Sequence, residues 1–168
     1  MAVYAVNKLM NEARRLASEY RKATGQTLPI TSEIAVNDVA RIMNLEATND
    51  RNCGYDAIGK GERDGLQYII KGRTIFDESK SGHRLGQFKF DIPWDGMFLV
   101  LMDEEYEPFE IYEASREELQ EAVDESQTSK RSKRGPVSVA KFKIIGHLVW
   151  TKEEGIVDDD VWDNQADV

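Results

Sequence analysis

The fold is decided by residues 54–73, which read GYDAIGKGERDGLQYIIKGR. Two short apolar segments flank a glycine-rich turn, and this pattern predicts a hairpin with strands over 54–58 and 66–73. Asp56 falls at the end of the first strand, and Lys71 falls inside the second. A lysine is rarely buried without a partner, so we expect Lys71 in a cleft beside an acid. The hairpin therefore predicts a polar site built on a β-sheet.

Two amphipathic helices are expected before the hairpin. Apolar residues recur at helical spacing over residues 3–23, with charged residues on the other side. Thr31 or Ser32 is expected to cap a second helix, which has Glu33 in its first turn. An acid at this position is favourable beside the helix dipole, whether or not it has a catalytic role.

Two further strands and two further helices are expected after the hairpin. The continuous apolar run at 97–102 is typical of a central strand covered on both faces, and 109–114 should pair with it antiparallel. Ser115 and Glu118 form a capping box that begins a third helix. Residues 139–149 have helical spacing, although a strand also fits them. These elements predict an α/β (α+β) fold with a central mixed four-stranded sheet flanked by helices.

The length of 168 residues suits a single domain. We expect that domain to span 1–152, with a helical N-terminal segment, 1–27, packed on it. Residues 153–168 carry seven acids and no base, and are expected to form a flexible acidic tail.

Composition favours a cytoplasmic protein that does not enter membranes. No apolar run approaches the roughly 18 residues that a bilayer-spanning helix needs. The N-terminus lacks a basic segment followed by an apolar one, so no signal peptide is expected. Cys53 is the only cysteine, so an intrachain disulfide is excluded and a reducing compartment is expected.

The net charge of −9 is unevenly distributed along the chain. Residues 1–102 carry a net charge of +1, residues 103–125 carry −10, and residues 126–152 carry +7. A surface that faces phosphate is therefore compatible with the acidic total. The candidate phosphate contacts are Arg73, Lys130, Arg131, Lys133 and Arg134. Equally, such blocks are typical of solvated faces.

The ordered set of motifs resembles the PD-(D/E)XK, or restriction-endonuclease-like, nuclease superfamily, in particular small bacterial or phage members. The resemblance covers roughly residues 28–150. It rests on the helix with Glu33, the Gly-Tyr-Asp at 54–56, the glycine turn, the strand that ends in Lys-Gly-Arg at 71–73, and Trp94-Asp95 before an apolar strand. Arg84-Leu85-Gly86, Glu105-Tyr106 and the late 139–143 helix agree with it.

The resemblance implies a restriction-endonuclease-like fold and a metal-dependent phosphodiesterase site. In that superfamily an aspartate, and a Glu or Asp two residues before the lysine, bind Mg²⁺ (or Mn²⁺), often with a glutamate from the preceding helix. The lysine orients or activates the attacking water. Asp56, Glu33 and Lys71 match this pattern, whereas Ile69 stands where the second carboxylate belongs.

Two substitutes for the missing acid follow from the strand itself. The backbone carbonyl of Ile70 can bind metal, as the carbonyl of the middle residue does in the family. Strand alternation also places Gln67 on the same face as Ile69 and Lys71, and its amide oxygen is a weak neutral ligand.

Three functions are therefore open from the sequence. The first is a Mg²⁺-dependent DNA phosphodiesterase in which Glu33, Asp56 and Lys71 are catalytic. The second is a catalytically silent relative that binds nucleic acid or a protein, which Ile69 favours. The third is an acidic partner protein whose tail masks its own basic loop or a basic surface elsewhere. A homodimer is compatible with each of them.

Overall fold

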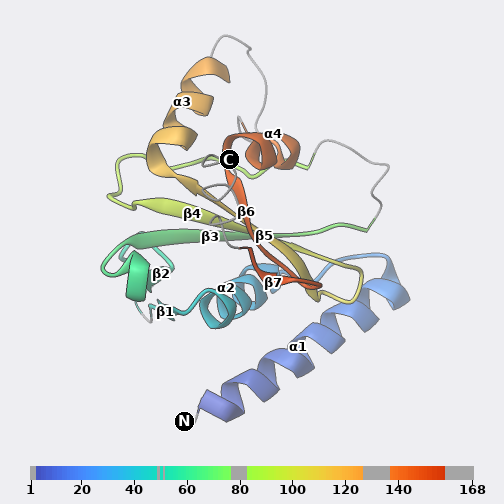
Figure 1. The fold of residues 1–168 in the computed structure, drawn as a ribbon. Helices are drawn as coiled ribbons and strands as arrows, with labels where there is room; N and C mark the ends of the chain where they lie inside the picture. The colour runs from blue at the N-terminus through green and yellow to red at the C-terminus, as the bar shows by residue number, and fades with distance from the viewer. Residues whose placement is uncertain (1–2, 49, 51, 77–82, 127–136, 158–168) are drawn as a thin grey trace, which may run out of the picture.

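The computed structural model describes residues 3–48, 50, 52–76, 83–126 and 137–157. They form three layers, with a central β-sheet covered by two helices on each face (Figure 1). Helices α1 (Val3–Thr24) and α2 (Thr31–Ile42) cover one face, and α3 (Arg116–Ser126) and α4 (Val139–Ile145) cover the other. No helix in these ranges has the length and apolar character that crossing a membrane requires.

Within the described residues the sheet is mixed and has seven strands in the order β1-β2-β3-β4-β5-β6-β7. Among these strands β3 and β4 pair in parallel, and each of the other neighbouring pairs is antiparallel. The strands are β1 (Leu45–Ala47), β2 (Ala57–Gly59), β3 (Gln67–Thr74), β4 (Gly96–Met102), β5 (Pro108–Ser115), β6 (His147–Thr151) and β7 (Gly155–Ile156), with a short 3-10 turn at Gly61–Arg63.

The expected mixed α+β class is confirmed, but the expected four-stranded sheet is wrong. The three additional strands are β1, β6 and β7. β6 covers residues 147–149 of the 139–149 segment, for which the sequence favours a helix and leaves a strand open. α4 ends at Gly146, where a Cβ atom would lie 2.6 Å from the Glu113 carbonyl oxygen, so the chain can approach β5 and pair with it. β7 lies within the segment expected as a flexible tail; residues 158–168 lie outside the described part.

Local signals near the helix starts give mixed results. The capping box is confirmed, because the Ser115 N–H donates to Glu118 Oε2 (2.8 Å) and the Glu118 N–H donates to Ser115 Oγ (3.2 Å). The expected cap of α2 is wrong, because its N-cap residue is Ile30, which makes no side-chain capping bond. The first hairpin strand begins at 57, so Asp56 precedes β2 instead of ending it.

The core consists of two apolar layers, one on each face of the sheet. Alternate residues of β4 supply both: Phe98 and Val100 face α2, and Met97 and Leu99 face α3 and α4. All seven residues of β4 are buried, which confirms the expectation of a central strand covered on both faces. This rigid centre holds β3 in place, because β3 pairs with β4 along its whole length.

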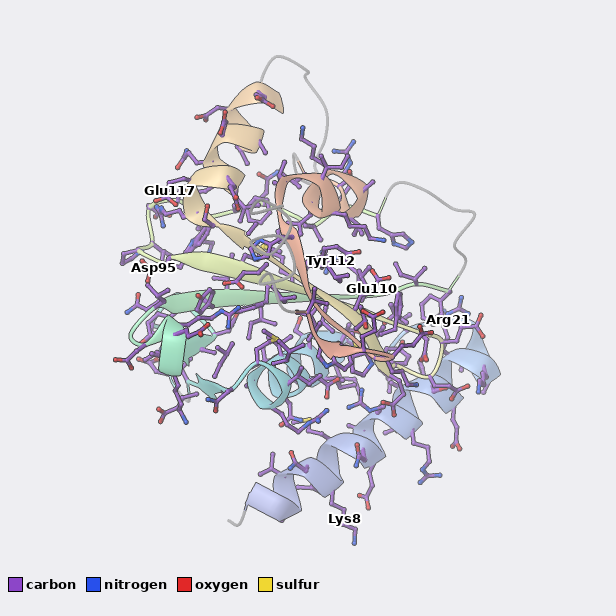
Figure 2. The ribbon with its side chains drawn as sticks, viewed as in Figure 1. Lys8, Arg21, Asp95, Glu110, Tyr112 and Glu117 are labelled. Atoms are coloured by element: carbon purple, nitrogen blue, oxygen red, sulfur yellow. The ribbon has the colours of Figure 1, made fainter. Side chains whose placement is uncertain are left out.

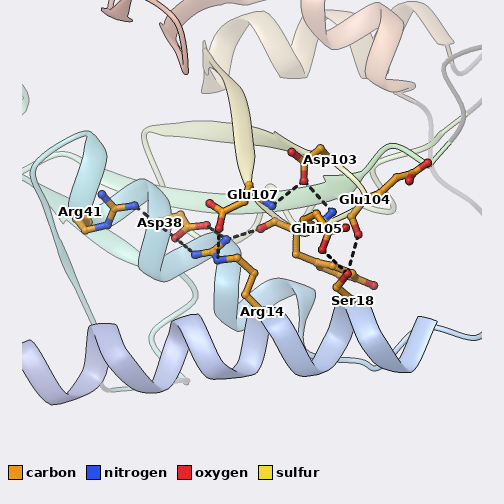
Figure 3. Close-up of polar contacts among 9 residues, drawn as sticks. Arg14, Ser18, Asp38, Arg41, Asp103, Glu104, Glu105 and Glu107 are labelled. Atoms are coloured by element: carbon orange, nitrogen blue, oxygen red, sulfur yellow. Dashed lines mark hydrogen bonds and ion pairs between the residues drawn. The ribbon is translucent and has the colours of Figure 1, made fainter. Parts of the chain in front are cut away.

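A buried ion pair attaches α1 to the rest of the fold. Arg14 donates two hydrogen bonds to the Asp38 carboxylate of α2 (2.9 and 2.8 Å) and a third to the carbonyl oxygen of Tyr106 (Figure 3). Nearby, Ser18 donates to Glu105 Oε2 (2.8 Å). One arginine therefore joins α1, α2 and the turn between β4 and β5.

Replacing Asp38 with alanine should lower the free energy of unfolding by about 3–5 kcal/mol, because it leaves the Arg14 charge buried without its carboxylate. Urea denaturation measures this effect. Arg15→Ala, which removes an exposed pair with Glu19 on the same helix, is the matched control and should change stability by less than about 0.5 kcal/mol. Equal effects of the two substitutions would contradict the role given to the buried pair.

Candidate functional site

Strand β3 distributes its side chains between the two faces of the sheet. Tyr68 and Ile70 pack in the layer under α1 and α2, while Ile69 packs in the layer under α3 and α4. Lys71 therefore points to the α3 and α4 side, as strand alternation requires. There its ammonium lies 5.7 Å from the centre of the Phe88 ring.

Asp56 is fixed at the edge of β3, at the point where β2 begins. Its backbone N–H donates to the Tyr68 carbonyl (2.8 Å), and its carboxylate Oδ2 accepts the Ile70 N–H (2.7 Å). The Asp56 side chain thus replaces the next backbone hydrogen-bond acceptor between β2 and β3. The Ile70 carbonyl points to the same side of β3 as the Ile70 N–H, because both groups of one residue face the same neighbouring strand in an antiparallel pair.

Two hollows meet at Asp56. The larger, of about 420 Å³, lies against α2 and has Glu33, Thr48 and Tyr55 among its lining residues. The smaller, of about 210 Å³, contains Lys71, with Ile69 and Phe88 in its walls. Asp56 lines both hollows. The structure thus brings Glu33 and Lys71 to Asp56 from different sides.

Gly54 and Ile92 each line both hollows. Gly54 has φ +88°, and a Cβ atom there would lie 2.2 Å from Ile92 Cγ2. A larger residue at 54 would displace Ile92. Lys89, from the same loop as Ile92, lines both hollows as well.

The loop over 83–95 forms the outer wall of the site and is held at both ends. At one end, Leu85 N–H donates to the Val137 carbonyl (3.0 Å). At the other, Arg116 donates to the carbonyl oxygens of Phe90, Ile92 and Trp94. The Arg116 N–H also donates to the carbonyl of Asp95, which lies next to the start of α3 (Figure 2).

Burial shifts the pKa values of the central pair toward neutrality. It raises the pKa of the Asp56 carboxyl, and the Glu33 charge adds to this rise, while the Ile70 N–H and Lys71 act against it. Burial also lowers the pKa of the Lys71 ammonium, with a further contribution from Arg73 and opposition from Asp56. Buried groups with shifted pKa values beside a hollow are typical of reactive sites.

The donor set suits a divalent cation held by few protein ligands. Within the described ranges no three His, Cys, Asp or Glu side chains gather closely enough to hold a metal ion. Asp56 retains lone pairs beyond the bond from Ile70, the Ile70 carbonyl faces the same edge, and Glu33 lies within electrostatic range. Mg²⁺ often uses one or two carboxylates and keeps several waters, so this set fits it.

The remaining sequence candidates lie elsewhere. Gln67 lines neither hollow, and its backbone exchanges hydrogen bonds with Asp95. Arg73 donates to the carbonyls of Arg84 and Gly72, below the outer loop. The basic residues Lys130, Arg131, Lys133 and Arg134 lie outside the described part of the chain.

Sequence reasoning missed the residues that the outer loop supplies. Gln87, Phe88, Lys89 and Ile92 line the hollows, yet the 74–93 segment has no periodicity that would indicate a wall. One signal was available in Arg116, since an arginine in the first turn of a helix opposes the helix dipole and is typical of a residue with another partner.

The chain matches no model of a known protein family and no curated protein.

Asp56→Asn should make the metal-free protein more stable at pH 7, because the asparagine oxygen can still accept the Ile70 N–H without a buried charge. The pKa of Asp56 is higher in the folded state than in the unfolded state. The contribution of Asp56 to the free energy of unfolding is therefore complete below pH 3.8 and is lost as the pH rises through the folded-state pKa. The stability difference between the variant and the wild type should therefore grow with pH. Urea titrations between pH 4 and 7 measure it, and a difference independent of pH would contradict the shift. Asp64→Asn, in the exposed turn, is the control.

Gly54→Ala should destabilise the fold by about 1–3 kcal/mol, because the new methyl group collides with Ile92. Gly65→Ala is the matched control: Gly65 also has a positive φ, of +78°, but its added Cβ atom would meet nothing within 4 Å. Urea denaturation measures how much more Gly54→Ala lowers the free energy of unfolding than Gly65→Ala does. This difference should disappear in an Ile92→Ala background. An unchanged difference in that background would contradict the contact.

Proposed function

We propose that the chain is a divalent-metal-dependent DNA phosphodiesterase with a restriction-endonuclease-like fold of the PD-(D/E)XK type. The observation that carries the proposal is the position of Asp56. Its carboxylate is half-buried at the edge of β3 and accepts the Ile70 N–H, with Lys71 in the hollow on one side and Glu33 in the hollow on the other. A mixed sheet flanked by helices on both faces also agrees with the proposed fold.

Each of these residues has a distinct part in the proposed reaction. Asp56, Glu33 and the Ile70 carbonyl would hold Mg²⁺ or Mn²⁺, which lowers the pKa of bound water and offsets the charge of the reacting phosphate. Lys71 lines the smaller hollow, where its Nζ would orient the attacking water and offset charge on the phosphate; burial lowers the pKa of this ammonium. Lys89 lies across the same hollow, where it can pair with a phosphate oxygen.

Ile69 favours a second candidate function, a catalytically silent relative that binds nucleic acid or a protein. Its side chain lines the smaller hollow where the family pattern has a carboxylate, so the cation would lack one negative ligand there. In the silent protein, Lys71 and Asp56 would remain as a charge pair beside the hollow. The acidic segment after residue 152 would then favour a basic protein partner over nucleic acid.

Metal-dependent cleavage of plasmid and single-stranded DNA tests the first function. Asp56→Asn and Lys71→Ala should each lower the rate by about a hundredfold or more, because the first removes a charged ligand of the metal and the second removes the cation beside the reacting phosphate. Asp64→Asn and Lys60→Ala, two exposed substitutions in the hairpin turn, are the matched controls and should leave the rate unchanged. Cleavage that survives at Asp56→Asn would overturn the proposal.

Ile69→Glu should tighten Mn²⁺ binding, measured by calorimetry, and should raise the cleavage rate, because it restores the missing carboxylate beside Lys71. Ile69→Gln has the same shape without the charge and should do neither. If the wild type does not cleave DNA but Ile69→Glu does, the natural protein is the silent relative. If neither protein binds metal nor cleaves DNA, the restriction-endonuclease-like chemistry is wrong.

A further inference from the structure

The smaller hollow has the size and walls of a site for one planar group. Its volume of about 210 Å³ lies below the roughly 300–1,000 Å³ of sites for drug-sized ligands. Ile69, Phe88, Ile92 and Trp94 make its apolar walls. The polar side chains of Asp56, Lys71, Gln87 and Lys89 also line it. Such a mixture suits a ligand with a flat apolar face and a polar edge.

Phe88 is the wall residue most suited to stacking. Its side chain is only partly buried, whereas Trp94 is almost completely covered. The centres of the Phe88 and Phe90 rings lie 6.2 Å apart, so Phe90 packs beside Phe88. Lys71 Nζ lies 5.7 Å from the centre of the Phe88 ring. An aromatic ring beside a cation is the combination with which proteins bind single-stranded nucleic acid, because the base stacks while the phosphate meets the charge.

The charge of the site disfavours a double helix. The residues that line the two hollows include two cations, Lys71 and Lys89, and two acids, Glu33 and Asp56. Asp91 and Asp95 flank the lining residues Ile92 and Trp94. A duplex presents one negative charge for about every 1.7 Å of its axis, and its binding needs a broad basic surface. A single strand needs fewer cations on the protein, because stacking of its bases on aromatic side chains also contributes to binding.

We propose that the hollow beside Lys71 binds an unstacked base of single-stranded DNA. Phe88 stacks on the base, Gln87 is placed to hydrogen-bond to its edge, and Lys89 pairs with the adjoining phosphate. This inference rests on the proposed function for DNA as the ligand, and it adds that the substrate is a single strand.

Fluorescence anisotropy in EDTA measures binding apart from cleavage. The probes are a labelled oligothymidylate of about eight nucleotides and a duplex of the same strand length. The full chain should bind the single strand at least tenfold more tightly than the duplex. Phe88→Leu should weaken that binding by about five- to a hundredfold, whereas Phe88→Trp, which keeps an aromatic ring, should bind about as tightly as the wild type. Phe109→Leu, at a partly buried ring that lines neither hollow, is the matched control and should bind like the wild type.

The inference is overturned if the duplex binds as tightly as the single strand, if oligothymidylate does not bind, or if Phe88→Leu binds it like the wild type. Cleavage assays with Mn²⁺ separate this result from the proposed function. Duplex cleavage that is unchanged in Phe88→Leu would keep the phosphodiesterase and remove the base pocket. Single-strand binding that depends on Phe88, without any cleavage, would keep the pocket and remove the metal-dependent reaction.

Discussion

The hydrogen bond from the Ile70 N–H to the Asp56 carboxylate is the contact on which the candidate site depends. A buried backbone N–H needs an acceptor, and β2 no longer supplies one at this point of β3. Asp56 fills that place with its side chain. The same bond fixes the acid at the edge of the strand and keeps it within reach of both faces of the sheet. The hydrogen bond that ends the pairing of β2 and β3 therefore also positions the acid of the polar site.

The second constraint is the attachment of the outer loop. Arg116 binds three carbonyl groups of that loop and stacks near the rings of Phe90 and Trp94. Arg116 lies at the N-terminus of α3, where an acid would interact more favourably with the helix dipole. Its hydrogen bonds give the loop opposite β3 a defined shape. Glu33 lies on α2, Lys71 lies on β3 and Asp56 lies directly before β2, whereas Phe88 and Lys89 lie on the loop that Arg116 holds in place.

The parts of the fold with local patterns are predictable from the sequence. The N-terminal helices follow from periodicity, the hairpin from its glycine-rich turn, and the buried strand from the continuous apolar run at 97–102. The Ser115 capping box follows from residue spacing. The short strands β1 and β7 do not follow from any such pattern, because runs of three and two residues are too short to show the alternation of a strand. The segment 139–151 divides at Gly146 for a tertiary reason, its closeness to Glu113. Asp56 and Lys71 can be singled out in the hairpin and Glu33 on the preceding helix, while Phe88 and Lys89 depend on the path that Arg116 gives the outer loop.

Since the Asp56 carboxylate lines both hollows, a change in its charge acts on both of them. A cation bound beside Glu33 would favour the ionised form of Asp56, and that charge would in turn attract the ammonium of Lys71 in the neighbouring hollow. Occupancy on one side would alter affinity on the other by a common factor, and the effect must be reciprocal. A single proton on Asp56 therefore couples the two halves of the site.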